Sequence, residues 1–126
     1  MTDTEPDMEA LMLADNPEFE RVMECVFGLR AHETETYLVL ATLPGSTATE
    51  LATELERDRS TVQRTLSTLV EYQLAERDRR IVDGGGTVYQ YFAKPIPEIQ
   101  QRMRRTVDEW VEEVHNTIDS FGAYSE

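Results

Sequence analysis

The segment 47–92 constrains the fold more than any other part of this 126-residue chain. Thr47 and Glu50 have the spacing of a capping box and therefore predict the start of a short helix. Asp58 can cap a second helix over Arg59–Tyr72, which begins shortly after the first one ends. Two short helices joined by a tight turn are the pattern of a helix-turn-helix.

A glycine-rich turn divides the following residues into two β-prone runs. The runs are Ala75–Val82 and Thr87–Ala93, with Asp83–Gly86 between them, and they predict a β-hairpin. Alternation along the second run places Tyr89 and Tyr91 on one face. A helix-turn-helix followed by a hairpin is a winged helix, so we expect a mainly α fold with a small β-hairpin (α+β).

Basic residues are concentrated in one window, although the chain as a whole is acidic. The 24 residues from Arg57 to Arg80 hold six of the twelve basic residues but only four acidic ones, a formal charge of +2. The remainder holds 6 basic and 21 acidic residues, a formal charge of −15. A basic helix and hairpin on an acidic protein favour DNA binding by this part of the chain.

The second helix of the helix-turn-helix has an apolar and a polar side. Val62, Leu66, Leu69 and Val70 recur at helical spacing and form the inner stripe. The outward residues carry hydroxyl, amide and guanidinium groups, which contact base edges and phosphates in DNA complexes. The alternative is an ordinary solvated helix face. The outward residues are Ser60, Thr61, Gln63, Arg64, Ser67 and Thr68.

The first strand of the predicted hairpin carries Arg77, Arg79 and Arg80. Arginines on such a wing can bind the DNA backbone or enter the minor groove. The alternative is a solvated hairpin whose arginines pair with Glu76 and Asp78.

The composition indicates a protein that works in concentrated salt. The formal net charge is −13, and eleven of the twelve basic residues are arginine, with Lys94 as the only lysine. This usage is typical of a haloarchaeal cytoplasm, because carboxylates hold water and cations while the lysine stem adds apolar surface. At about 1 M salt the Debye length is about 3 Å, so the net charge would repel DNA weakly. The alternative is an ordinary acidic protein.

Other classes of protein are disfavoured by what the sequence lacks. No segment has the roughly 20 apolar residues needed to cross a membrane, and the acidic N-terminus does not resemble a secretory signal, so we expect a cytoplasmic protein. A single cysteine excludes an internal disulfide and a cysteine-rich zinc site. We find no phosphate-binding loop, zinc-protease motif or nucleophile elbow, so we expect no enzyme activity, metal or cofactor.

The chain divides into three predicted parts: a flexible acidic N-terminus over 1–14, a winged-helix domain over 15–94 and a C-terminal dimerisation helix over 95–126. The last helix carries apolar residues at intervals of three or four, close to a coiled-coil seam. A domain this small has no room to bury the whole stripe, so we expect the helix to pack against the same helix of a second copy. The resulting dimer would present two recognition helices to DNA. The alternative is packing on the first helices of the same chain. The stripe is Ile99, Met103, Val107, Trp110, Val114, Ile118 and Phe121.

The only cysteine, Cys25, lies in the first predicted helix, which Asp15 or Asn16 would cap and Gly28 would end. At about 100° per residue, Cys25 lies roughly 130° from the centre of the apolar stripe of that helix, so we expect partial exposure. Arg21, one turn earlier, favours a thiolate. We interpret Cys25 as a redox switch that forms a disulfide between two copies or a sulfenic acid. The alternative is an inert cysteine.

Several groups of residues between Val26 and Pro97 follow one another in a characteristic order. They are Gly28-Leu29 with Glu33, Tyr37, Leu38 and Leu40; Thr47–Ala52, Arg59–Val62 and Leu66–Leu69; and Tyr89–Ala93 with Pro95. In this order they resemble the TrmB-type archaeal regulators. MarR- and ArsR-like winged helices share most of the single groups, so their order carries the resemblance.

The resemblance implies a sequence-specific transcription regulator that binds double-stranded promoter DNA as a homodimer. Three features depart from the family pattern. Arg30 stands where a capping Ser or Thr is usual, Gln73 stands where a turn glycine is usual, and the large sugar-binding domain is absent, so we expect no small-molecule ligand. The alternative function is a winged-helix protein-interaction module of a transcription assembly. By position, the implied recognition-helix contacts are Arg59, Ser60, Thr61, Gln63 and Arg64.

Overall fold

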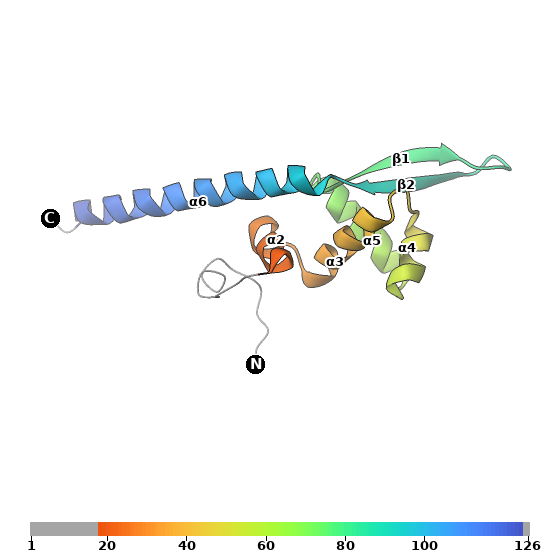
Figure 1. Ribbon diagram of the computed structural model, residues 1–126, viewed down its shortest axis with the longest axis horizontal. Coiled ribbons are helices and arrows are strands. Elements are labelled where there is room, and N and C mark those ends of the chain that lie inside the picture. The colour runs from red at the N-terminus through yellow and green to blue at the C-terminus, as the bar shows by residue number, and fades with distance from the viewer. Residues whose placement is uncertain (1–17, 125–126) are drawn as a thin grey trace.

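The computed structural model describes residues 18–124, and Figure 1 shows a small helical body from which one long helix extends. Asp15, Asn16 and the acidic segment 1–14 lie outside this part of the chain. A mainly α fold with a small β-hairpin is confirmed. No helix within residues 18–124 combines the length and apolar character needed to cross a membrane. In chain order the elements are α2 (Phe19–Phe27), α3 (Ala31–Thr42), α4 (Ala48–Leu55), α5 (Arg59–Glu71), β1 (Ala75–Ile81), β2 (Thr87–Ala93) and α6 (Ile96–Tyr124).

The helix ends follow the local chemistry of the sequence. At the start of α4, the Glu50 N–H donates to Thr47 Oγ1 at 3.1 Å and the Thr47 N–H donates to the Glu50 carboxylate at 2.9 Å, which is the predicted capping box. At the start of α5, the Ser60 N–H donates to the Asp58 carboxylate at 3.1 Å. Gly28 ends α2 with a φ of 71°, a left-handed conformation that glycine adopts without steric cost.

Helix α3 lies at the centre of the fold and packs against α2, α5 and β2. Its N-cap residue, Arg30, has no hydroxyl, but the Arg30 N–H donates to the Glu33 carboxylate at 2.8 Å, which is one half of a capping box. Tyr37 is fully buried. Its hydroxyl donates to the Lys94 carbonyl at 2.6 Å, which ties the central helix to the chain just before α6.

Strands β1 and β2 form an antiparallel hairpin, the wing, in which Arg77 is opposite Tyr91 and Arg79 is opposite Tyr89. The chain before α4 joins this sheet by one bridge, in which the Tyr91 N–H donates to the Ser46 carbonyl at 2.9 Å. The wing is thereby attached to the helical body near Tyr91, while its glycine-rich turn projects beyond that body (Figure 1).

The apolar stripe of α6 divides into two parts. Ile99 and Met103 are only 0% and 6% exposed, because α6 packs on α2 at this level and both side chains join the core. The expectation that these two residues lie in a dimer seam is therefore corrected: their partner is their own chain. Farther along, Ile118 and Phe121 are 63% and 72% exposed. Between them, the half-buried members of the stripe are Val107, Trp110 and Val114.

Candidate nucleic-acid interface

The polar side of α5 is open along the helix. Ser60, Arg64 and Ser67 are exposed, whereas Val62 and Leu66 on the other side are buried in the core. The helical spacing therefore separated the two sides of α5 correctly. The remaining outward residues lie at the edges of the open face and are half-buried: Thr61, Gln63 and Thr68.

Hydrogen bonds orient the side chains at the first turn of α5. The Asp58 carboxylate accepts from both the backbone N–H and the hydroxyl of Ser60. The Ser60 hydroxyl, followed by a backbone bond from Thr61, holds the pKa of Asp58 below its usual range, because both bonds favour the ionised carboxyl. Arg59 Nε donates to Thr49 Oγ1 at 3.0 Å and links α5 to α4. Arg59 and Ser60 thus remain exposed while neighbouring residues fix their direction.

Gln63 attaches the wing to α5. Its side-chain amide donates to the Tyr91 hydroxyl at 3.0 Å, from α5 to β2. Tyr91 is only 1% exposed, so this contact is built into the core side of the wing. The spacing of the sequence placed Gln63 on the outward face but did not reveal this partner. Gln63 therefore holds the wing in place on α5, and this role is separate from the contact with DNA that the sequence predicted for it.

The strand pairing separates the three wing arginines onto two faces. Side chains of directly paired residues project from the same face of an antiparallel pair. Arg77 and Arg79 therefore share a face with Tyr89 and Tyr91, and Tyr91 is the residue that reaches α5. Arg80 projects from the opposite face. Arg77 and Arg79 therefore lie on the wing face that also carries the contact with α5, and Arg80 lies on the other face.

Tyr89 supports one of these arginines, a contact that the sequence reasoning missed. The Arg77 guanidinium lies over the Tyr89 ring, 4.3 Å from its centre, in a cation–π contact. The alternation of Tyr89 and Tyr91 in the sequence indicated that both rings lie on one face of the hairpin. Which arginine lies over Tyr89 depends on the strand register, which the sequence does not give. Glu76 pairs with Lys94 at 2.9 Å, and within residues 18–124 no ion pair joins Glu76 or Asp78 to a wing arginine. The alternative in which these acids neutralise the arginines is therefore not the arrangement found.

The C-terminal end of α5 is held by a residue of α6. Gln73, just after α5, has a φ of 61°, so the missing glycine leaves a strained backbone at the helix exit. The Arg102 guanidinium donates to the carbonyls of Gln73 at 2.6 Å and Tyr72 at 2.9 Å. It also lies 5.2 Å from the centre of the Phe27 ring on α2. A cation at this end of a helix interacts favourably with the helix dipole, so Arg102 fixes α5 relative to α6.

Cys25 lies on α2, outside the open face of α5, and is half-buried as expected from its helical position. Among the described residues, histidine, cysteine and carboxylate side chains do not gather into a group that could hold a metal ion.

Comparison with known proteins connects this arrangement to one family. The family model for the "Sugar-specific transcriptional regulator TrmB" matches residues 23–97, from α2 to the start of α6. The "Uncharacterized protein MJ1503" of Methanocaldococcus jannaschii is 30% identical over 101 residues, which are 80% of this chain and 76% of that protein.

Two solved structures share the fold. The "Possible transcriptional regulator from Methanosarcina mazei Go1" has a TM-score of 0.74 and 25% identity, and the match covers 80% of this chain and 86% of that one. The ST1889 protein of Sulfolobus tokodaii has a TM-score of 0.62 and 17% identity, covering 74% and 91% of the two chains. The match to the family model over more than half of the chain, together with these likenesses, shows that this protein belongs to the TrmB family of transcriptional regulators.

Proposed function

We propose that this chain is a sequence-specific, DNA-binding regulator of transcription that acts as a homodimer. The observation that carries the proposal is that two surfaces with exposed arginines lie on elements that a hydrogen bond joins. One is the open face of α5 with Arg64, and the other is the wing face with Arg77 and Arg79. Because the bond between Gln63 and Tyr91 fixes the wing next to α5, α5 can enter the major groove while the wing lies along the flanking backbone or minor groove.

The open face supports different tasks for different residues. Arg64 and Ser67 are exposed along α5, so they are the residues we assign to base edges. Arg59 is turned toward α4 by its bond to Thr49, which places it toward the border of the face. Arg77 and Arg79 supply contacts to phosphates, which strengthen binding to any sequence and weaken with salt.

Selection of DNA sequences from a random duplex library, at about 1 M KCl, where the Debye length is about 3 Å, tests the proposal. We expect enrichment of one sequence with two related half-sites. Arg64→Ala should weaken binding to that sequence by about 1–3 kcal/mol and relax the preference at one position. Arg105→Ala, which removes an exposed arginine of α6 instead, should leave binding unchanged. Failure to enrich any sequence, or equal losses in both variants, would contradict the proposal.

The homodimer is supported by the distal part of α6. Val111, Ile118 and Phe121 are exposed large apolar residues on one helix, and exposed apolar patches of this kind mark interaction surfaces. The same surface favours the second candidate function, a protein-interaction module, because a different chain could cover it. Sedimentation of the purified chain separates the two: a homodimer forms without any other protein, whereas a module for another chain sediments as a monomer.

We also propose that oxidation of Cys25 changes the DNA binding of the dimer. Peroxide would oxidise two thiols to one disulfide and be reduced to water, or would oxidise one thiol to a sulfenic acid. A disulfide between copies requires the two Cα atoms to approach within about 7 Å. Non-reducing electrophoresis and DNA binding before and after peroxide, compared with Cys25→Ser, test this step. No covalent dimer together with unchanged DNA binding in the oxidised protein would overturn it.

A further inference from the structure

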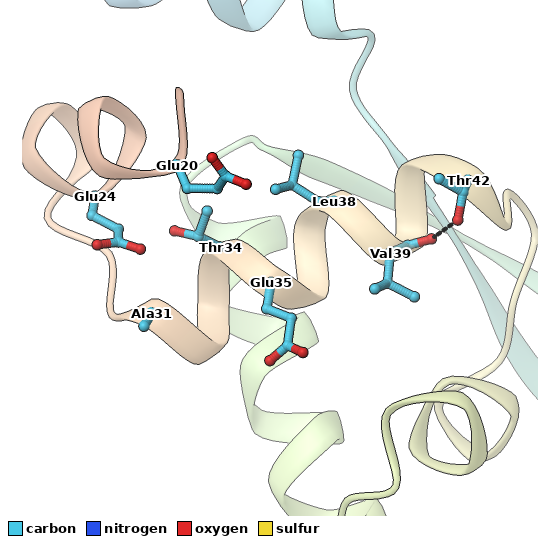
Figure 2. Close-up of a pocket in the computed structure, with 8 residues that line it drawn as sticks. All are labelled: Glu20, Glu24, Ala31, Thr34, Glu35, Leu38, Val39 and Thr42. Carbon is cyan, nitrogen blue, oxygen red and sulfur yellow. Dashed lines mark hydrogen bonds between the residues drawn. The ribbon is translucent and has the colours of Figure 1, made fainter. Parts of the chain in front are cut away.

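A hollow between α2 and α3 has the features of a small ligand site. Its volume is about 270 Å³, close to the lower end of the range of roughly 300–1,000 Å³ for small-molecule sites. Figure 2 shows its lining: Glu20 and Glu24 project from α2, while Thr34, Glu35 and Leu38 project from α3. The hollow is thus bordered by carboxylates from two helices and has apolar side chains between them.

Thr34 is the residue that points to a ligand. Its side chain is 1% exposed, and within residues 18–124 its hydroxyl oxygen is the one buried side-chain polar atom without a hydrogen-bond partner. Buried hydroxyl groups are nearly always hydrogen-bonded, because losing water without a replacement is unfavourable. In Figure 2 this oxygen lies on the side of Thr34 that faces Glu24. Because Thr34 also lines the hollow, a molecule bound there is the candidate partner for this hydroxyl.

The charges around the hollow favour a cation. Burial raises the pKa of Glu24. The positive charge of Arg21 lowers this pKa in part, and the negative charge of Glu20 raises it further. In the described part of the chain, neither Glu20 nor Glu24 forms an ion pair. A carboxylate that has lost water beside a second carboxylate is stabilised by a positive charge. Anions would meet repulsion here.

We propose that this hollow binds an aliphatic primary ammonium ion. An ammonium group has three N–H donors and no acceptor, which matches a Glu24 carboxylate and a Thr34 hydroxyl oxygen that both accept. The alkyl part would lie along Ala31, Leu38 and Val39, the apolar residues that line the same hollow. A metal ion fits less well, because residues 18–124 offer no suitable group of ligands at this place. The proposal revises the expectation that the chain binds no small molecule.

The site has a direct connection to the helix-turn-helix. Glu35, at the rim of the hollow, pairs with Arg57 at 3.0 Å, and Arg57 lies between α4 and α5. An ammonium ion that reaches Glu35 would compete with Arg57 for the carboxylate and alter this link. An effect of the ligand on the helix-turn-helix matters only if the proposed DNA binding is right. Binding of the ammonium ion itself does not depend on that proposal, so it is measured on the chain without DNA.

Calorimetric titration of the intact chain with n-butylammonium chloride tests the site, with 1-butanol as an uncharged probe of similar shape. We expect saturable binding of the ammonium ion and none of the alcohol. Thr34→Val keeps the shape and removes the hydroxyl, so the affinity should fall about tenfold, as expected for one lost bond to a charged group. Glu24→Gln should reduce the affinity at least as much. Glu54→Gln removes the same charge from the exposed face of α4 and should leave the affinity unchanged.

Three outcomes would overturn the proposal. They are the absence of saturable binding, equal binding of the alcohol and the ammonium ion, and equal losses in Glu24→Gln and Glu54→Gln, which would reflect only the general negative charge. Thr34→Val removes a hydroxyl that makes no hydrogen bond, so it is expected to fold. If it does not, Glu24→Gln and its control still decide the question. If the chain binds the ammonium ion but no DNA, the ligand site is supported and the proposed function is contradicted.

Discussion

The two parts of α6 carry one apolar stripe but place it in different surroundings. Near the start of the helix, Ile99 and Met103 are buried beside α2 and belong to the core. Farther along, the helix leaves the body (Figure 1), and Ile118 and Phe121 are exposed. The spacing of the stripe is nearly the same in both parts. Helical periodicity therefore identifies an apolar face, but it does not identify the partner that covers each residue.

The largest expected effect separates the two parts by folding stability. Ile99→Ala should lower the free energy of unfolding by about 2–5 kcal/mol, because it removes buried groups and leaves a cavity. Ile118→Ala deletes the same atoms from an exposed position and should change it by less than about 0.5 kcal/mol when the chain is monomeric. Urea unfolding followed by circular dichroism measures both values. Equal losses would show that the two parts do not differ as described.

The next effect concerns self-association and applies to the distal part alone. Ile118→Glu places a charge in the exposed stripe and should weaken dimerisation by about 2 kcal/mol or more if this residue anchors the interface. Asn116→Glu adds the same charge at another exposed position of the same helix and should have little effect. Sedimentation equilibrium measures both dissociation constants. Tight dimers of Ile118→Glu would place the interface elsewhere.

A pH effect is expected at the start of α6, where Tyr37 holds the Lys94 carbonyl. Burial raises the pKa of Tyr37 from 10.0 to about 12, and the Glu98 carboxylate adds to this while Arg102 opposes it. The unfolded chain therefore loses the proton first, so the stability from Tyr37 is complete below pH 10.0 and is lost as the pH rises toward about 12.

Thermal unfolding across this alkaline range, with wild type and Tyr37→Phe, measures the effect. The variant should show a weaker decline with pH, because the group that titrates is gone. Tyr72→Phe, at an exposed tyrosine, serves as the control and should follow the wild type. A decline of equal slope in all three proteins would remove Tyr37 as its source.

The smallest effect concerns the junction of α5 and α6. Gln73→Gly should stabilise the chain by about 0.5–1 kcal/mol, because glycine relieves the left-handed strain but adds entropy to the unfolded chain. The same replacement in regular helix, Gln100→Gly on the exposed side of α6, should instead cost about 1 kcal/mol. Denaturant midpoints of the two variants should therefore move in opposite directions. A destabilised Gln73→Gly would mean that the glutamine side chain makes a contribution larger than the strain.

Local sequence signals predicted the elements well because their causes are local. The capping box of Thr47 and Glu50, the cap of Asp58 and the stop at Gly28 each involve residues within a few positions of one another. The open side of α5 also followed from helical spacing. These features required no knowledge of how the elements pack.

The features that the sequence did not reveal depend on distant partners. Helical spacing predicted Gln63 on the outward face; the residue is half-buried at the edge of that face, and its bond to Tyr91 depends on the position of β2 relative to α5. Alternation along β1 alone separates Arg80 from Arg77 and Arg79, but which of the two faces turns toward α5 depends on how β2 packs. The buried hydroxyl of Thr34 becomes significant only when α2 and α3 are seen together.

The hydrogen bonds of Arg102 bear on how the proposed DNA-binding part could be transplanted onto another protein. A cut at Pro95, where the chain looks easiest to divide, would discard Arg102 together with Ile99 and Met103. The graft would then keep two carbonyls at the end of α5 without their donor and an uncovered core. A hybrid that retains α6 for at least one turn beyond Met103 preserves all these contacts. The transferable unit therefore extends past the joint between wing and helix.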